Sequence, residues 1–184
     1  MSSIQQLRIA PVAASIDNPD DWEALANQIT AGAGMPTAVT PEMIIGMIAS
    51  AVPLLFVADA AGDANLLRGT FSDSVVAQCT RNSGELMDAL PTTAAVHLVG
   101  SRVVDGHPVV RAHLSIQTRA GDGTPTTQNQ FWDLQFGGRV TVGQPNCPNC
   151  GAPIGTGELV CGHCHTDVRS VVDVPIVVSR LDLY

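Results

Sequence analysis

The sequence predicts an α+β domain in which helices pack on an antiparallel sheet and a small metal-binding loop interrupts the sheet before its last strand. Apolar residues recur at helical spacing as far as Leu90, and the period changes to two after Pro91. Four cysteines lie between the last two β-rich segments. A chain of 184 residues holds one domain with a hydrophobic core and a small appendage, and two domains of full size do not fit.

The first forty residues are expected to hold one short helix. The segment Asn18-Pro19-Asp20-Asp21 suits a helix start, with a capping side chain, a proline in the first turn and acids near the positive helix end. Trp22, Leu25 and Ile29 then recur at helical spacing. We expect this stripe to pack on the chain itself, and a partner is the alternative.

Residues 43–58 contain no charge and leave no polar face on a helix. Such a helix must be covered on every side. The run falls short of the ~20 residues that span a bilayer, and Pro53 is expected to kink it or divide it into two helices. Two interpretations stay open: a helix buried under the sheet, or one that packs on copies of itself, with Gly46 and Ser50 allowing close contact. The residues expected to make such contacts are Met43, Ile44, Ile45, Met47, Ile48, Leu54, Leu55 and Phe56.

The chain then passes from helices to strands. A turn at Gly62 leads into a helix that carries Phe71 and Cys79, and a shorter helical piece over residues 86–90 ends at Pro91. Strands are expected over residues 95–104, 109–118, 126–136 and 174–183, and Asp105-Gly106 is a strong hairpin signal between the first two. In the second strand Val110, Ala112, Leu114 and Ile116 alternate with polar residues, so one face should meet the core.

Cys147, Cys150, Cys161 and Cys164 form two CxxC pairs that are ten residues apart. This spacing is typical of a closed four-thiolate site, in which the metal holds a loop together and has no open position for substrate. Zinc is the expected ion, iron in the same cage would make the loop an electron carrier, and two disulfides are the third possibility. The first six residues do not resemble an export signal, and a reducing cytosol favours metal over disulfides.

The remaining reactive side chains have simpler explanations. His163 and His165 flank Cys164 but are not needed once four cysteines supply the ligands. Cys79 lies in an apolar helical stretch and is expected to be a small buried side chain. Arg111, His113, Ser115 and Asp133 could form a general acid and base set, but the alternation of an ordinary strand produces the same spacing. We therefore expect no catalysis.

The charge of the chain bears on its partners. Nine basic residues, all of them arginine, stand against seventeen acids and give a net charge of −8. Phosphate backbones would repel such a chain, so nucleic acid is not an expected partner.

The chain resembles a known family through its element order and through two motifs. These are Phe131-Trp132 in the third strand and Cys147-Pro148-Asn149-Cys150-Gly151-Ala152-Pro153. They resemble the bacterial relatives of the C-terminal domain of the forty-four-kilodalton subunit of the mitochondrial inner-membrane import translocase. The resemblance covers residues 41–184; the last strand lacks the tryptophan expected near its start, and the first forty residues do not match. It implies helices on a curved antiparallel sheet, a cone like that of nuclear transport factor two, and action at membrane surfaces as a tether or assembly platform.

In architecture and in its apolar segment, the chain is also similar to the membrane-associated stalk subunit of actinobacterial oxygen-tolerant hydrogenases. Three regions are then expected: an N-terminal segment over residues 1–40, a cone-like domain over residues 41–140 with 174–184, and a zinc ribbon over residues 141–173. The expected function is a non-catalytic scaffold that oligomerises through the apolar helix and assembles a partner complex, such as a respiratory hydrogenase, at the cytoplasmic membrane face. The alternatives are a module that binds lipid or quinone, a small-molecule isomerase or dehydratase, and an iron electron carrier.

Overall fold

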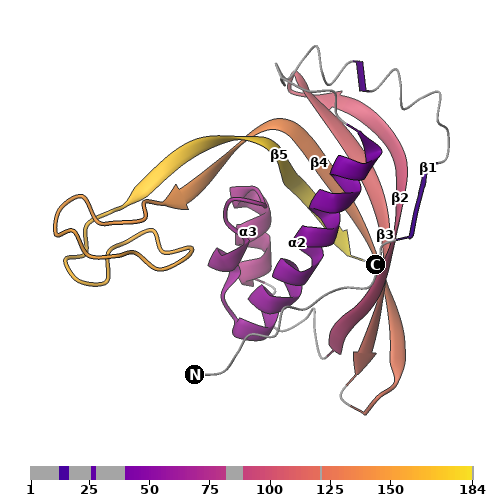
Figure 1. Cartoon of the computed structure of the whole chain (residues 1–184), viewed down its shortest axis with the longest axis horizontal. Helices are drawn as coiled ribbons and strands as arrows, with labels where there is room; N and C mark the ends of the chain where they lie inside the picture. The colour runs from indigo at the N-terminus through magenta and orange to yellow at the C-terminus, as the bar shows by residue number, and fades with distance from the viewer. Residues whose placement is uncertain (1–12, 17–25, 28–39, 82–88, 121, 184) are drawn as a thin grey trace.

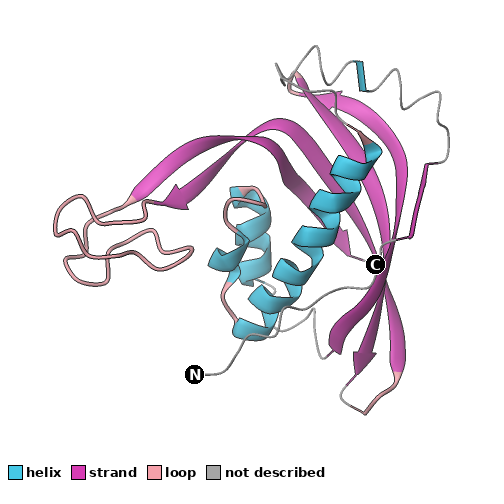
Figure 2. Cartoon of the chain, in the orientation of Figure 1, coloured by secondary structure: helices cyan, strands magenta, loops and turns pink. Residues whose placement is uncertain are grey.

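The computed structural model describes residues 13–16, 26–27, 40–81, 89–120 and 122–183. Within these ranges an α+β arrangement is present, with helices packed against a sheet (Figures 1 and 2). The helix expected around Trp22 lies outside the described residues, except that Ala26 and Asn27 are helical. The described elements are β1 (Ala13–Ile16), α2 (Pro41–Ala61), the 3₁₀ helix η1 (Ala64–Leu67), α3 (Asp73–Arg81), β2 (Ala89–Val104), β3 (His107–Ala120), β4 (Pro125–Gly143) and β5 (Arg169–Leu183).

The sheet has the order β1-β2-β3-β4-β5. The four long strands are antiparallel, which confirms the predicted sheet, and β1 adds a short parallel strand that the sequence did not predict. Asp105 and Gly106 both have positive φ values, of 49° and 80°, and join β2 to β3 as the hairpin signal predicts.

The strands are longer than the sequence predicts. β2 begins at Ala89, so Ala89 and Leu90 are strand and not the end of a helix, and Pro91 lies within the strand. β4 continues from Phe136 to Gly143, and β5 begins at Arg169. The extra pairs carry the β4 and β5 hairpin outward as an arm, and the cysteine loop lies at the end of this arm (Figure 1).

α2 is one unbroken helix of 21 residues. The Thr40 hydroxyl accepts a hydrogen bond from the Met43 N–H at 3.3 Å, and Gly62 ends the helix in the left-handed conformation. Pro53 lies inside the helix and does not divide it, so the expectation of two helices is wrong.

Packing explains the continuity of α2 across this proline. Val52 and Leu55, on either side of it, are buried in the core. Burying two such side chains is worth more than the ~3 kcal/mol that an interior proline costs.

The hydrophobic core fills the space between the helices and the concave face of the sheet (Figure 1). Trp132 is fully buried there, meets the Phe71 ring edge-on at 5.6 Å, and donates a hydrogen bond from Nε1 to Gln130 Oε1 at 2.8 Å. The predicted inward set of β3 is confirmed, since all four of its members are in the core. They are Val110, Ala112, Leu114 and Ile116.

Two glycines in the middle of β4 allow the sheet to bend sharply. Gly137 has a positive φ of 71°, and a Cβ on Gly138 would lie 2.2 Å from Cγ1 of Val177 on β5. Only a residue without a side chain permits this approach of the two strands. The bend lets the core part of the sheet curve over the helices while the arm leaves them (Figure 1).

Replacing Gly138 with alanine should therefore destabilise the domain by about 1–3 kcal/mol, because the new methyl group overlaps Val177. The Gly138→Ala/Val177→Ala double variant should lose less stability than the two single variants predict together. Urea denaturation followed by circular dichroism measures these free energies of unfolding. Additive losses would show that the close approach does not couple the two positions.

Candidate metal centre

The four cysteines lie in the loop between β4 and β5, over residues 144–168. Their Sγ atoms are all within 4.8 Å of one another, with 3.5 Å between Cys147 and Cys164 and 3.7 Å between Cys150 and Cys161. A tetrahedron of thiolates at ~2.3 Å from an ion has sulfurs about 3.8 Å apart, so the cage has the size that a metal requires. The cysteines are free thiols and not disulfides.

The loop consists of two knuckles that repeat the same hydrogen bonds fourteen residues apart. The Gly151 N–H donates to the Cys147 carbonyl, and the His165 N–H donates to the Cys161 carbonyl, both at 2.9 Å. The Cys147 N–H binds the Ala152 carbonyl at 2.8 Å, and its counterpart in the second knuckle binds Thr166 at 2.9 Å. Each knuckle therefore presents two sulfurs from a closed turn, and the cage forms where the turns face each other.

The residue after each second cysteine has left-handed backbone geometry. In the first knuckle this is Gly151, with φ of 72°, and in the second it is His165, with φ of 57°. A side chain makes this conformation cost about 1–2 kcal/mol. Glycine adopts this geometry readily at Gly151, whereas the equivalent position of His165 becomes visible only when the two knuckles are aligned.

Neighbouring polar groups ionise the cysteines unequally. Hydrogen bonds from the Thr166 hydroxyl and backbone N–H, and from Asn149, lower the pKa of Cys164 to about 5. At Cys150 the Ala152 N–H favours the thiolate, but the adjacent sulfurs of the cage and desolvation outweigh it and raise the pKa to about 12. Cys164 therefore ionises more readily than Cys150, and a bound cation would favour the thiolate form of both.

The knuckles are attached to the domain by tight backbone contacts. A Cβ on Gly143 would lie 2.0 Å from the Glu158 carbonyl oxygen, and one on Gly157 would lie 2.5 Å from that of Asn65 at the end of the helical layer. The Thr141 hydroxyl donates to the Asp73 carboxylate of α3 at 2.6 Å. The loop and the arm thus contact the helices as well as their own strands.

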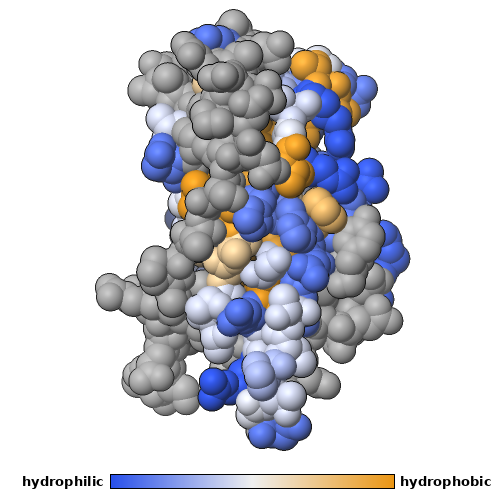
Figure 3. Space-filling model, turned by 90° about the vertical axis from the view of Figure 1, so that its right-hand side faces the viewer, coloured by the Kyte–Doolittle hydropathy of each residue, from blue (hydrophilic) through white to orange (hydrophobic). Residues whose placement is uncertain are grey.

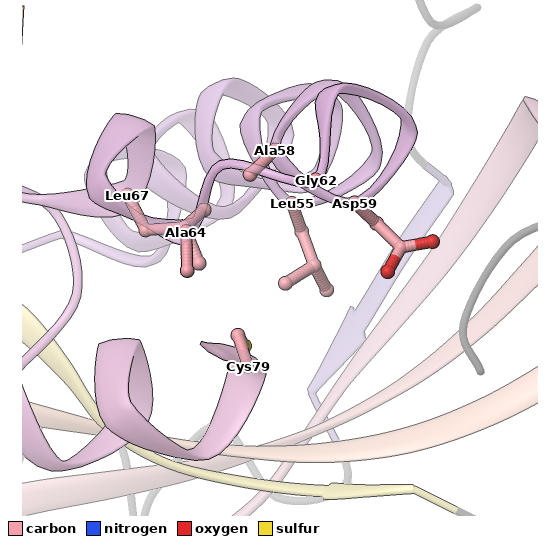
Figure 4. Close-up of a pocket in the computed structure, with 7 residues that line it drawn as sticks. All are labelled: Leu55, Ala58, Asp59, Gly62, Ala64, Leu67 and Cys79. Carbon is pink, nitrogen blue, oxygen red and sulfur yellow. The ribbon is translucent and has the colours of Figure 1, made fainter. Parts of the chain in front are cut away.

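His163, His165 and Cys79 lie outside the cage, as the sequence predicts. His163 and His165 are exposed and are not part of the cage. Cys79 is buried, and burial followed by the charge of Asp59 raises the pKa of its thiol. It lines a space of about 10 Å³ beneath Leu55 and Ala64, which is room for about one water molecule (Figure 4).

Of the four polar residues that the sequence singles out on β3 and β4, Arg111 and Asp133 come together as an ion pair, whereas His113 and Ser115 have other partners. Arg111 and Arg102 flank the buried Asp133 carboxylate, with 3.9 Å from Arg111 Nε to Asp133 Oδ1. His113 lies 4.8 Å from the Phe131 ring, and the Ser115 hydroxyl donates to Asn129. The side of the molecule seen in Figure 3 is mostly polar over the described residues, with separate hydrophobic spots.

No protein-family model, curated protein or solved structure matches the chain significantly. The chemistry of the cage is therefore read from its own residues. Four sulfurs at metal-binding distance, closed by two matching knuckles, can hold one tetrahedral metal ion.

Replacing Cys161, the most deeply buried of the four ligands, with serine should abolish stoichiometric metal binding, because three thiolates do not close the cage. Inductively coupled plasma mass spectrometry of the purified chain measures this. The His163→Ala and His165→Ala variants serve as matched controls and should keep their metal. Loss of metal from either control would mean that an imidazole takes part in coordination.

Replacing His165 with glycine should raise the thermal stability of the metal-bound protein, because glycine adopts the left-handed geometry without a side-chain clash. The gain should be about 1 kcal/mol, measured by differential scanning calorimetry. His163→Gly is the control, since His163 does not have a positive φ, and it should give no gain. Equal effects of both substitutions would contradict the role of backbone strain.

Proposed function

We propose that the chain is a non-catalytic scaffold that assembles with copies of itself through the outer face of α2. The supporting observation is that this helix has one face in the core and a second apolar face in solvent. Met43, Leu54 and Val57 are 42%, 37% and 40% exposed. Because water does not favour such a surface, contact with another apolar surface would remove a free-energy cost.

The eight residues expected at the interface separate into two groups. Ile44, Ile48, Leu55 and Phe56 are buried in the core of this chain. Met43 and Leu54 are exposed, and Ile45 and Met47 are half-buried. The proposed interface therefore consists of Met43, Met47, Leu54 and Val57, which helical geometry places on one side of α2.

The middle of this face suits close approach of a second helix. No atom lies within 4 Å of the position that a Cβ on Gly46 would occupy. The Ser50 hydroxyl donates to the Gly46 carbonyl at 2.8 Å, so its polar group is already satisfied within the helix. A surface of small residues bordered by large apolar side chains favours packing between helix backbones.

We also propose that the cage holds zinc in a structural role. Four protein thiolates leave no coordination position for water or substrate, which is the pattern of structural zinc sites. Iron would fit the same sulfurs, and its red colour would distinguish it from colourless zinc. The proposal further includes the cone fold and the membrane-associated family that the chain resembles, with the cytoplasmic membrane face as its location and a larger complex, such as a respiratory hydrogenase, as its partner.

A second candidate function is binding of a lipid or quinone by the same apolar face. The segment Glu42–Ala61 is long and apolar enough to cross a membrane, with a mean hydropathy of 2.1. Assembled copies of this face could equally enclose a hydrophobic ligand. Extraction of a lipid or quinone from the purified assembly would favour this function.

The Leu54→Ser/Val57→Ser double variant should dissociate the assembly that forms through α2, because it makes the exposed face polar and leaves the core unchanged. Native mass spectrometry would report the loss of subunits, with a population shift of at least about tenfold for ~1.4 kcal/mol of lost contact. Val103→Ser, at a 60% exposed residue of β2, is the matched control. An assembly unaffected by the double variant would exclude this face as the interface.

A further inference from the structure

The outer edge of β5 has unused backbone groups along the arm. The Val178 N–H donates to the Thr70 carbonyl at 3.0 Å, and its carbonyl accepts from the Ser72 N–H at 2.9 Å, so both groups point away from β4. In an antiparallel ladder every second residue points the same way. At the far end of the arm the Gln144 N–H donates to the Val168 carbonyl and the Arg169 N–H donates to the Asp167 carboxylate, both at 2.9 Å, so the Arg169 N–H also points away from β4. The alternation therefore changes phase between Val178 and Arg169, where Gly137 of β4 has a positive φ and faces Pro175.

It follows that Val171 and Asp173, two and four residues after Arg169, direct their N–H and C=O groups to the free edge. Among the described residues, none makes a backbone hydrogen bond to this stretch from the outer side. The edge is open for a further strand, and β-strands recruit such partners readily.

We propose that this edge pairs with the same edge of a second copy, as an antiparallel two-fold contact centred on Val171. In this register the Val171 residues of the two copies exchange N–H and C=O hydrogen bonds across the axis, and their side chains meet there. Val171 is 57% exposed, and Val172 is exposed as well. The contact would cover both valines and use the free backbone groups.

Charge complementarity indicates that the partner of this edge is a second copy of the chain. The same register sets Arg169 of each copy opposite Asp173 of the other, twice across the axis. Both side chains are well exposed, and among the described residues each pairs with an exposed partner: Asp167 for Arg169 and Arg139 for Asp173. Opposite charges facing each other across strands stabilise the pairing, and like charges oppose it.

This interface is separate from the face of α2, since it lies on the arm beyond the bend of the sheet (Figure 1). It therefore adds a second contact to the proposed scaffold and does not depend on the first. The two contacts can be tested in the same protein by different substitutions.

Charge reversal tests the register directly. Asp173→Arg places two arginines opposite each other in the contact, and Arg169→Asp places two aspartates there. Each variant alone should weaken self-association by about tenfold or more, because both symmetric pairs become repulsive. An equimolar mixture of D173R and R169D should restore association as a mixed dimer, and so should the R169D/D173R double variant.

Sedimentation velocity and native mass spectrometry of the full chain would measure these species, in the native background and in the Leu54→Ser/Val57→Ser background. Metal content and circular dichroism check folding, and the exposed intrachain pairs contribute little to it. The proposal would be overturned if the chain with the Leu54→Ser and Val57→Ser substitutions is a monomer. It would also be overturned if the single charge variants associate as strongly as the native chain, or if their mixture associates no more strongly than each variant alone. If the substitutions in α2 have no effect on association, the charge-reversal variants still test the β5 contact independently.

Discussion

The contact between Gly138 and Val177 determines how the rest of the molecule is arranged. Without a side chain at Gly138, β4 and β5 approach closely enough for the sheet to bend. On one side of the bend the concave face receives Trp132 and the helices, and on the other the same two strands form an arm. A single sheet thereby supplies both a core and a projecting element, so the domain needs no separate linker to carry its cysteine loop.

Ordering the long cysteine loop costs conformational entropy, and a metal site can offset this cost. Residues 144–168 connect β4 to β5, and ordering them costs conformational free energy. The small apolar cluster of Cys147, Cys161 and Val168 offsets only part of this cost. A metal bound to four thiolates would supply the remainder, since its binding free energy becomes folding free energy. The contact of Gly157 with Asn65 then extends this order to the helical layer.

Local chemistry in the sequence predicts much of this structure. Hairpin residues such as Asp105 and Gly106, the alternation in β3 and the cysteine spacing each act over a few residues, and each is confirmed. The missed features depend on distant packing. β1 is visible only through its pairing with β2, and α2 stays whole across Pro53 because the core holds both sides.

The two borders of the sheet differ, and this difference limits how large a paired structure can grow. β1 already occupies part of the border formed by β2, alongside Ala95 to Leu98, whereas no strand of the described residues pairs with the border of β5 along the arm. Joining two molecules border to border would use the vacant site of each and offer none to a third. Through the β5 border alone such an association ends at a closed pair, and growth beyond the pair would need a different surface, such as the outer face of α2.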